Sequence, residues 1–192
     1  MDEPANIMLI SFGYFENGLL VHLANAVEHE FNHPVKIKVA HLDLSEYFDP
    51  GRRQYNGNKL LALIEALVLP GSIKTIGLFS VDLYIPILTF IFGQAVLGGE
   101  TGIASVYRLN NELYGMPADN NILMDRIKKE VIHELGHTFG LIHCHNQTCV
   151  MRSSTYVEDI DLKDWHLCQA CRDSIRQLPD RVPGDGVPFK NK

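Results

Sequence analysis

The sequence predicts an α/β domain in which helices cover a largely parallel sheet. From residue 6 to residue 80, short apolar runs of strand length alternate with longer segments whose apolar residues recur at helical spacing. Such a β-α-β-α-β order brings consecutive strands together in parallel, because each intervening helix crosses over the sheet. The length of 192 residues, 46% of them hydrophobic, favours one domain with a sizeable core, with or without a small appendage.

The first five elements follow from these patterns and from the residues that interrupt them. Apolar runs or apolar–basic alternation predict the strands, and leucine, alanine and valine at spacings of three and four predict the helices. Pro34 lies just beyond the first helix, Pro70-Gly71 closes the second, and Pro50-Gly51 predicts a turn within a loop over residues 43–54. The predicted strands are residues 6–12, 35–42 and 73–80, and the predicted helices are residues 17–30 and 56–68.

The next part of the chain is less regular. Residues 84–93 could form a strand or a loop, because Pro86 is unfavourable in a central strand. Residues 101–109 alternate well enough to predict another strand, with Gly98-Gly99 before it and Asn110-Asn111 after it as punctuation. After a third helix, a last helix is expected within residues 157–175. The tail from residue 179 contains three prolines and two glycines and is expected to be loose.

The third helix is predicted from about Asn121 to Phe139, with Asp119-Asn120 as its N-terminal cap. Its two sides differ in character, as expected for a helix packed on a sheet. The apolar side consists of Leu123, Ile127, Val131, Leu135 and either Thr138 or Phe139. The charged side, expected to face solvent, consists of Arg126, Lys128, Lys129 and Glu130.

Residues 133–143 read HELGHTFGLIH and span the end of that helix. Four residues turn an α-helix through about 400° and rise about 6 Å, so His133 and His137 leave one face one turn apart. Glu134 lies beside the first histidine, where its carboxylate can reach a metal-bound water. Gly140 can end the helix in the left-handed conformation, and the returning chain lets His143 supply a third nitrogen. Three protein ligands and one open position are typical of a catalytic zinc.

A bare HExxH pattern also occurs by chance, and two histidines on an apolar helix are often ordinary core or surface residues. The glycine and the third histidine at fixed offsets favour the zinc site over this alternative. Gly140 and His143 are therefore as informative as the first two histidines.

All four cysteines follow the histidine motif, with spacing C-x4-C, a gap of eighteen residues, and C-x2-C. Two close pairs separated by a loop of this size predict a structural zinc with four thiolate ligands. The ligands would be Cys144, Cys149, Cys168 and Cys171. Two disulfides or buried free thiols are the alternatives. His145 and His166 are nearby substitutes if one cysteine is not a ligand.

Composition and charge exclude several other classes of function. The net charge of −6 and the lack of a basic run argue against nucleic-acid binding. Met1-Asp2-Glu3-Pro4 is acidic, unlike the start of a secretory signal, and the apolar run 85–97 is too short to span a bilayer. We therefore expect a cytoplasmic monomer without a membrane anchor. In the cytosol cysteines stay reduced, which favours metal ligation over disulfides.

HExxHxxGxxH followed by a methionine resembles the metzincin clan of zinc peptidases. Met151, eight residues past His143, matches the methionine that forms a turn beneath the zinc in that clan. HELGHTFGLIHC, Cys149-Val-Met151 and Cys168-Gln-Ala-Cys171 together resemble the archaemetzincins (archaelysins), in which four cysteines bind a second zinc. The upstream segment VDLYIPILTFIFGQA is also similar to this family, so the resemblance spans most of the chain.

The resemblance implies a metzincin-like α/β (α+β) fold: a twisted mixed sheet packed on helices, with the zinc helix ending at the Gly140 turn. An antiparallel edge strand, expected at residues 101–109, would face the cleft and pair with an extended peptide. Residues 1–140 would form the α/β part, residues 141–178 a zinc-bound subdomain, and residues 179–192 a flexible tail. The implied cofactors are a catalytic zinc on three histidines, supported by Met151, and a structural zinc on four cysteines.

The implied function is a zinc peptidase that uses Glu134 to activate water against peptide or protein substrates, and aminopeptidase activity is one type that the resemblance implies. The motif itself specifies only a zinc–water site. Two other functions therefore stay open: a zinc-stabilised binding or scaffold protein, and another zinc hydrolase such as an amidase. Tyr156 is a candidate donor to the oxyanion, and an ordinary buried tyrosine is the alternative.

Overall fold

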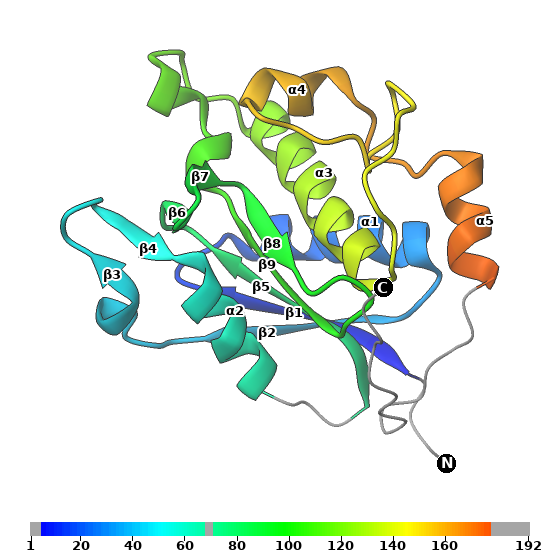
Figure 1. The fold of residues 1–192 in the computed structure, drawn as a ribbon, viewed down its shortest axis with the longest axis horizontal. Helices are drawn as coiled ribbons and strands as arrows, with labels where there is room; N and C mark the ends of the chain where they lie inside the picture. The colour runs from blue at the N-terminus through cyan, green and yellow to red at the C-terminus, as the bar shows by residue number, and fades with distance from the viewer. Residues whose placement is uncertain (1–4, 68–70, 178–192) are drawn as a thin grey trace.

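A five-stranded sheet with strand order β2-β1-β5-β9-β8 forms the centre of the molecule (Figure 1). The computed structural model describes residues 5–67 and 71–177. Four of the strands are parallel, and only β8 runs antiparallel to its neighbour β9. The strands are β1 (Asn6–Phe12), β2 (Val35–Ala40), β5 (Ser72–Phe79), β8 (Gly93–Ala95) and β9 (Thr101–Ser105). The predicted α/β class with a mixed sheet and an antiparallel edge strand is confirmed.

A second, smaller sheet lies beside the first and has the order β3-β4-β6-β7. Its strands are β3 (Phe48–Asp49), β4 (Gln54–Asn56), β6 (Leu83–Ile85) and β7 (Leu88–Ile91). The predicted turn at Pro50-Gly51 is confirmed, since it joins β3 to β4 within the segment expected to be a loop. The chain passes from β7 directly into β8, so this hairpin continues into the edge of the main sheet.

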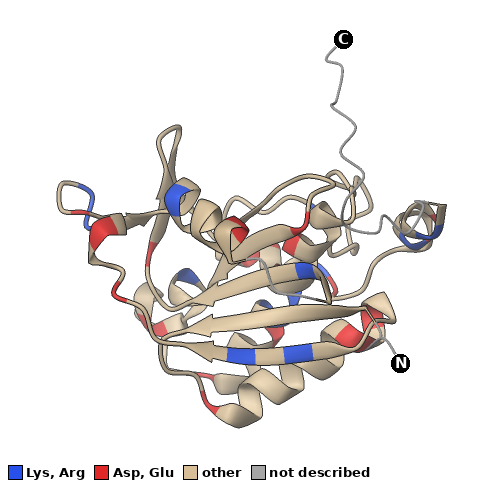
Figure 2. Cartoon of the chain, turned by 90° about the horizontal axis from the view of Figure 1, so that it is seen from below, with Lys and Arg blue, Asp and Glu red and all other residues tan. Residues whose placement is uncertain are grey.

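Helices cover both faces of the main sheet because successive strand residues point to opposite sides. On β1, Ile7 and Leu9 pack in one apolar cluster with α1 and α3, whereas Ile10 and Phe12 pack in a second cluster with α2. The helices are α1 (Asn17–Phe31), α2 (Gly57–Ala66), α3 (Asn120–Thr138), α4 (Val157–Leu162) and α5 (Gln169–Gln177). Acidic and basic residues are interspersed over these elements (Figure 2).

Two expectations about strands and helices are wrong. Residues 101–109 are not the antiparallel edge strand: β9 ends at Ser105, pairs in parallel with β5 and lies inside the sheet, while β8 forms the edge. Tyr107–Leu109 is a 3-10 turn instead. The expected helix over residues 157–175 is two helices, because the chain is extended at Lys163 (φ −98°, ψ 161°) between α4 and α5.

The charged side of α3 does not face solvent as expected. Arg126, Lys129 and Glu130 are all buried. The helix contacts α4 and the 3-10 turn Tyr107–Leu109. Arg126 donates to Asp161 on α4 and to the carbonyl oxygen of Leu109. The apolar face is buried as predicted, with Ile127, Val131 and Leu135 at most 1% exposed.

Several expectations fall on residues outside the described part of the chain. They are the loose tail from residue 179, the acidic start at residues 1–4, the last residue of the second helix at 68 and Pro70 of the predicted helix stop. Among the described residues, no helix combines the length and the apolar character that crossing a bilayer requires.

Candidate active site and metal centres

The C-terminal half of α3 carries two of the three motif histidines on one face. Asp119 caps the helix by accepting hydrogen bonds from the backbone N–H groups of Asn121 and Ile122, at 2.9 and 3.0 Å. The His133 and His137 rings are 4.6 Å apart between centroids, and their Nε2 atoms lie 3.1 Å apart. A core-facing helix therefore delivers two imidazoles to one point.

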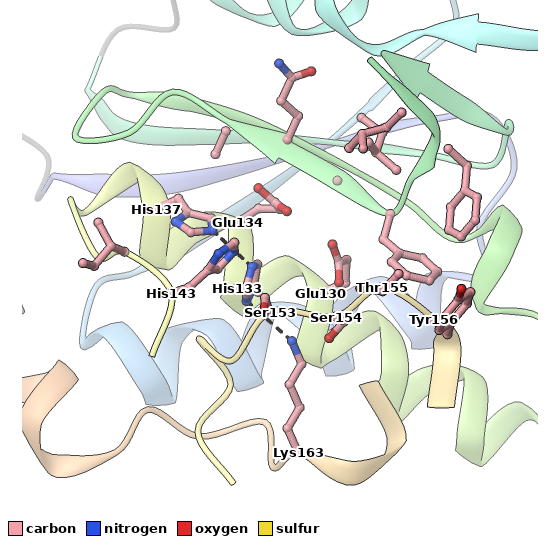
Figure 3. A pocket seen from close by; sticks show the side chains of 18 of the residues that line it. Glu130, His133, Glu134, His137, His143, Ser153, Ser154, Thr155, Tyr156 and Lys163 are labelled. Carbon is pink, nitrogen blue, oxygen red and sulfur yellow. Dashed lines mark hydrogen bonds between the residues drawn. The ribbon is translucent and has the colours of Figure 1, made fainter. Parts of the chain in front are cut away.

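The turn after α3 brings the third histidine to the same point. Gly140 has φ +85°, a conformation that glycine adopts without strain. The His143 ring centroid lies 5.3 Å from that of His133 and 5.0 Å from that of His137. Figure 3 shows the three rings pointing toward one another beside Glu134.

Backbone carbonyls fix the orientation of two of these rings. His133 Nδ1 donates to the Val150 carbonyl oxygen at 2.8 Å, and His137 Nδ1 donates to the Leu141 carbonyl oxygen at 2.7 Å. A carbonyl can only accept, so the proton of each neutral ring is on Nδ1 and the Nε2 lone pair is free for a metal. Burial lowers the pKa of all three histidines, which favours the neutral form that a metal requires.

This histidine cluster fits a zinc ion. One nitrogen atom from each of the three residues lies within 4.8 Å of the others. Three imidazoles are a ligand set that zinc uses in catalytic sites. Solvent can reach the cluster, because His143 is exposed and all three histidines line a cleft.

The cleft has a volume of about 760 Å³ and runs along the edge of the main sheet. Residues 88–95 of β7 and β8 line one wall, and residues 153–156 and Ile142 line the other. Tyr156 is 64% exposed and lies at the end of the cleft away from the three histidines (Figure 3). The structure thus does not place Tyr156 beside the histidine cluster.

Glu134 is buried on the cleft floor beside two charged residues that the sequence did not indicate. Glu134 is 4% exposed, Glu130 4% and Lys163 3%. Burial raises the pKa of Glu134 well above its usual value, and the neighbouring Glu130 carboxyl raises it further, while the Lys163 ammonium opposes both. Lys163 Nζ donates to the Arg152 carbonyl oxygen at 3.0 Å and lies 3.5 Å from His133 Nδ1.

Met151 lies directly beneath the histidine helix and is fully buried. A Cβ at Gly136 would overlap the Met151 Sδ atom and lie 3.0 Å from its Cε. Glycine at position 136 therefore lets the methionine pack against the helix backbone between His133 and His137.

We expect Gly136→Ala to lower the free energy of unfolding by about 1–3 kcal/mol, because the added methyl group overpacks the contact with Met151. Chemical denaturation measures this loss. Gly18→Ala on α1 is the matched control: no atom lies within 4 Å of a Cβ there, and the protein should become more stable by up to about 1 kcal/mol. A Gly136→Ala variant as stable as the wild type would refute the close-contact argument.

The four cysteines form a second cluster on the other side of the turn. Cys144 Sγ lies 3.8 Å from Cys168 Sγ, and Cys149 Sγ lies 3.8 Å from Cys171 Sγ. All four sulfur atoms lie within 4.8 Å of one another. Burial raises the pKa of the Cys149 and Cys171 thiols, so four neighbouring thiolates need a cation to compensate their charge. This donor set fits a structural zinc.

The two histidines considered as substitute ligands are not part of the four-cysteine group. His166 Nδ1 donates to Glu30 on α1 at 2.8 Å, and His145 is exposed. The metal-ligand groups found among the described residues are the three-histidine and four-cysteine sets.

The sequence model of the family described as "Peptidase family M54" matches residues 43–177. The chain belongs to peptidase family M54. As a member of M54 it is a zinc metallopeptidase, and the resemblance to the archaemetzincins is confirmed.

Known proteins resemble the chain over most of its length. An archaemetzincin from Methanocaldococcus jannaschii is 40% identical over 144 residues, which is 73% of this chain and 75% of that protein. The crystal structure of an archaemetzincin from Methanopyrus kandleri has 30% identity and a TM-score of 0.80, covering 91% of this chain and 94% of the other. A zinc-dependent peptidase from Methanocorpusculum labreanum has 30% identity and a TM-score of 0.79, covering 88% and 100%.

Sequence reasoning missed three features of this M54 site. Glu130 and Lys163 are buried charges that a helical pattern assigns to the surface. The third is Gly93 on β8, whose Cβ would lie 2.7 Å from both Cγ and Oε1 of Glu134. An isolated glycine within the apolar run 85–97 was the available signal, because it often marks a close backbone approach.

Proposed function

We propose that His133, His137 and His143 hold a catalytic zinc and that Glu134 is the general base in peptide hydrolysis. One observation carries this proposal: three imidazoles, two of them oriented by backbone carbonyl groups, converge in an open cleft beside the buried Glu134 side chain. Because all these side chains come from one chain, a monomer is sufficient for the reaction.

Held by the neutral imidazoles of His133, His137 and His143, a zinc ion would lower the pKa of a bound water to about 7 and would polarise the substrate carbonyl group. The Glu134 carboxylate accepts a proton from the attacking water and passes it to the leaving amine. The carbonyl groups of Val150 and Leu141 keep the Nδ1 protons of His133 and His137 in place throughout. Met151 supports the cluster by packing alone.

We propose that the substrate binds in an extended conformation along β8. This strand is at the edge of the sheet and lines the cleft, so its outer backbone groups can pair with a peptide. Gly93 lies at the start of β8 and against Glu134, which places the edge of the sheet next to the base.

Gly93→Ala should therefore lower kcat by about 10²-fold without loss of zinc, because a methyl group at this position displaces either Glu134 or the strand. The Cβ would also lie 2.7 Å from the Ile103 carbonyl oxygen, so the strand cannot move back to make room. Steady-state kinetics and metal analysis of the same preparation measure both quantities. Unchanged kcat would show that the spacing between β8 and Glu134 is not needed.

We further propose a second, structural zinc on the four cysteines, which makes residues 141–178 a small zinc-bound subdomain on the α/β part formed by residues 1–140. The shared turn supports this: His143 and Cys144 are adjacent, and the Cys144 N–H donates to the Met151 carbonyl oxygen at 2.9 Å. The structural zinc would then fix the backbone that aims the third catalytic ligand.

Metal analysis combined with a peptide-library screen tests the proposed function. We expect two zinc ions per chain and cleavage that a chelator abolishes and added zinc restores. Pairing each peptide with an N-terminally blocked copy tells whether cleavage needs a free amino terminus. Zinc binding without hydrolysis of any peptide would favour a binding protein, and hydrolysis of small amides alone would favour an amidase.

A further inference from the structure

A buried carboxylate on α1 lies outside the catalytic cleft and has no role in the chemistry proposed above. The Glu30 side chain is 0% exposed. Glu30 precedes the histidine motif by more than a hundred residues in the sequence. A buried carboxylate is costly unless hydrogen bonds and opposite charges compensate it. The partners of Glu30 therefore show what its burial achieves.

All three partners of Glu30 lie on the segment that presents the second cysteine pair. Its carboxylate accepts from His166 Nδ1 at 2.8 Å, from the Leu167 backbone N–H at 2.9 Å and from the Arg172 guanidinium at 3.1 Å. Arg172 Nε also donates to the Leu167 carbonyl oxygen at 3.0 Å. One side chain of α1 thus fixes residues 166–172, which include Cys168 and Cys171.

The same segment connects to the first histidine ligand through the backbone. The His166 carbonyl oxygen accepts from the Val150 N–H at 3.0 Å. The Val150 carbonyl oxygen in turn accepts from His133 Nδ1 at 2.8 Å. Three hydrogen bonds therefore connect the Glu30 carboxylate to the imidazole that would hold the catalytic zinc.

Residues of the cysteine cluster and of the histidine cluster are neighbours along this connection. Cys149 immediately precedes Val150, and its Sγ accepts from the Cys168 N–H at 3.3 Å. One backbone hydrogen bond and one hydrogen bond to a thiol thus join residues 149–150 to residues 166–168. Glu30 of α1 and His133 of α3 bond to this junction through Leu167 and Val150.

We propose that Glu30 is a positioning residue for the catalytic centre. Through the segment 166–168 and Val150 it sets the position of His133, and it fixes the second cysteine pair at the same time. The proposal rests on the proposed function, because it assigns the zinc to the three histidines. Glu30 itself touches neither the substrate nor the metal.

The test compares Glu30→Gln with Glu28→Gln, which changes an exposed glutamate on the same helix. Glutamine keeps the size of the side chain but removes the charge that compensates Arg172. Proteins loaded with Co²⁺ give separate absorption bands for a thiolate site and a histidine site. We expect release of Co²⁺ from the histidine site to a chelator to be about 10-fold faster in Glu30→Gln, as for other indirect ligand supports. The value of kcat should fall by a similar factor with little change in KM.

A general loss of stability must be separated from this effect. Ile64→Val removes one methylene group from the apolar cluster that packs α2 against the sheet. It should lower stability without changing any residue of the connection from Glu30 to His133. This variant should lower Tm while it releases metal at the wild-type rate. Equal release rates in Glu30→Gln and Glu28→Gln, or equally fast release in Ile64→Val, would overturn the proposal.

Should Glu30→Gln fail to fold, Arg172→Gln provides the same comparison. It removes one of the three partners at a side chain that is 33% exposed, and metal release should be several-fold faster than in Glu28→Gln. A wild-type release rate would overturn the proposal. Because metal release is measured without substrate, these results stand even if no peptide is cleaved, so failure of the proposed function is recognised separately.

Discussion

The Glu134→Ala variant is expected to lose kcat by about 10²–10⁴-fold in peptide hydrolysis while it keeps its full zinc content. Glu134 is the carboxylate next to the histidine cluster, and it is not one of the residues assigned to the metal. Its removal leaves the three imidazoles and their carbonyl partners unchanged. The loss should therefore appear in turnover and not in metal binding.

Two further variants make this experiment specific. Glu134→Gln keeps the volume of the side chain, so an equal loss of kcat excludes an effect of the cavity that alanine leaves. Glu158→Ala removes an exposed carboxylate on α4 and should behave as the wild type. If a folded, zinc-loaded Glu134→Ala protein cleaved peptides at the wild-type rate, Glu134 would not be the base.

The Cys168→Ser variant is expected to damage folding more than catalysis. Loss of one thiolate opens the four-cysteine site, and the binding energy of a structural zinc is also folding energy, on the order of 10–16 kcal/mol in isolated modules. The whole free energy of unfolding of a domain is only about 5–15 kcal/mol. Cys149 and Cys171 belong to the same apolar cluster as α1 and α3, so the damage should not stay local.

Thermal unfolding, soluble yield and zinc content measure this effect. Ser174→Ala on the same helix, α5, changes an exposed residue and should leave all three unchanged. Any Cys168→Ser protein that does fold should hold about one zinc per chain and unfold at a lower temperature. A Cys168→Ser protein with one zinc, normal activity and the soluble yield and unfolding temperature of the wild type would contradict the proposed role of the cysteine cluster.

Local patterns were sufficient for most of the fold. The alternation of strands and helices up to residue 80 predicted the order of β1, α1, β2, α2 and β5, and each lies within a few residues of its expected place. The Asp119 cap and the apolar face of α3 were also predicted correctly. These features depend on residues close in sequence, whose spacing fixes their mutual positions.

The direction of the strands at the sheet edge and the burial of the charged side of α3 were not predictable in the same way. The antiparallel edge is β8, and the sequence pattern of residues 101–109 could not show that β9 joins β5 in parallel instead. Arg126 and Glu130 look like surface residues in a helical pattern, but both are buried: Arg126 contacts Asp161 and Leu109, and Glu130 lies in the cleft with Lys163. In both cases the deciding neighbours are distant in sequence.

The two candidate ligand sets could be predicted from the sequence alone, because HExxHxxGxxH and the two cysteine pairs place their side chains through helix pitch and tight turns. Their surroundings depend on the packed fold: the carbonyl groups that orient His133 and His137, the buried Lys163, the contact of Gly93 with Glu134, and the connection from Glu30. These contacts join segments far apart in the chain. Their geometry depends on how helices and strands pack and is not encoded in the spacing of any one segment.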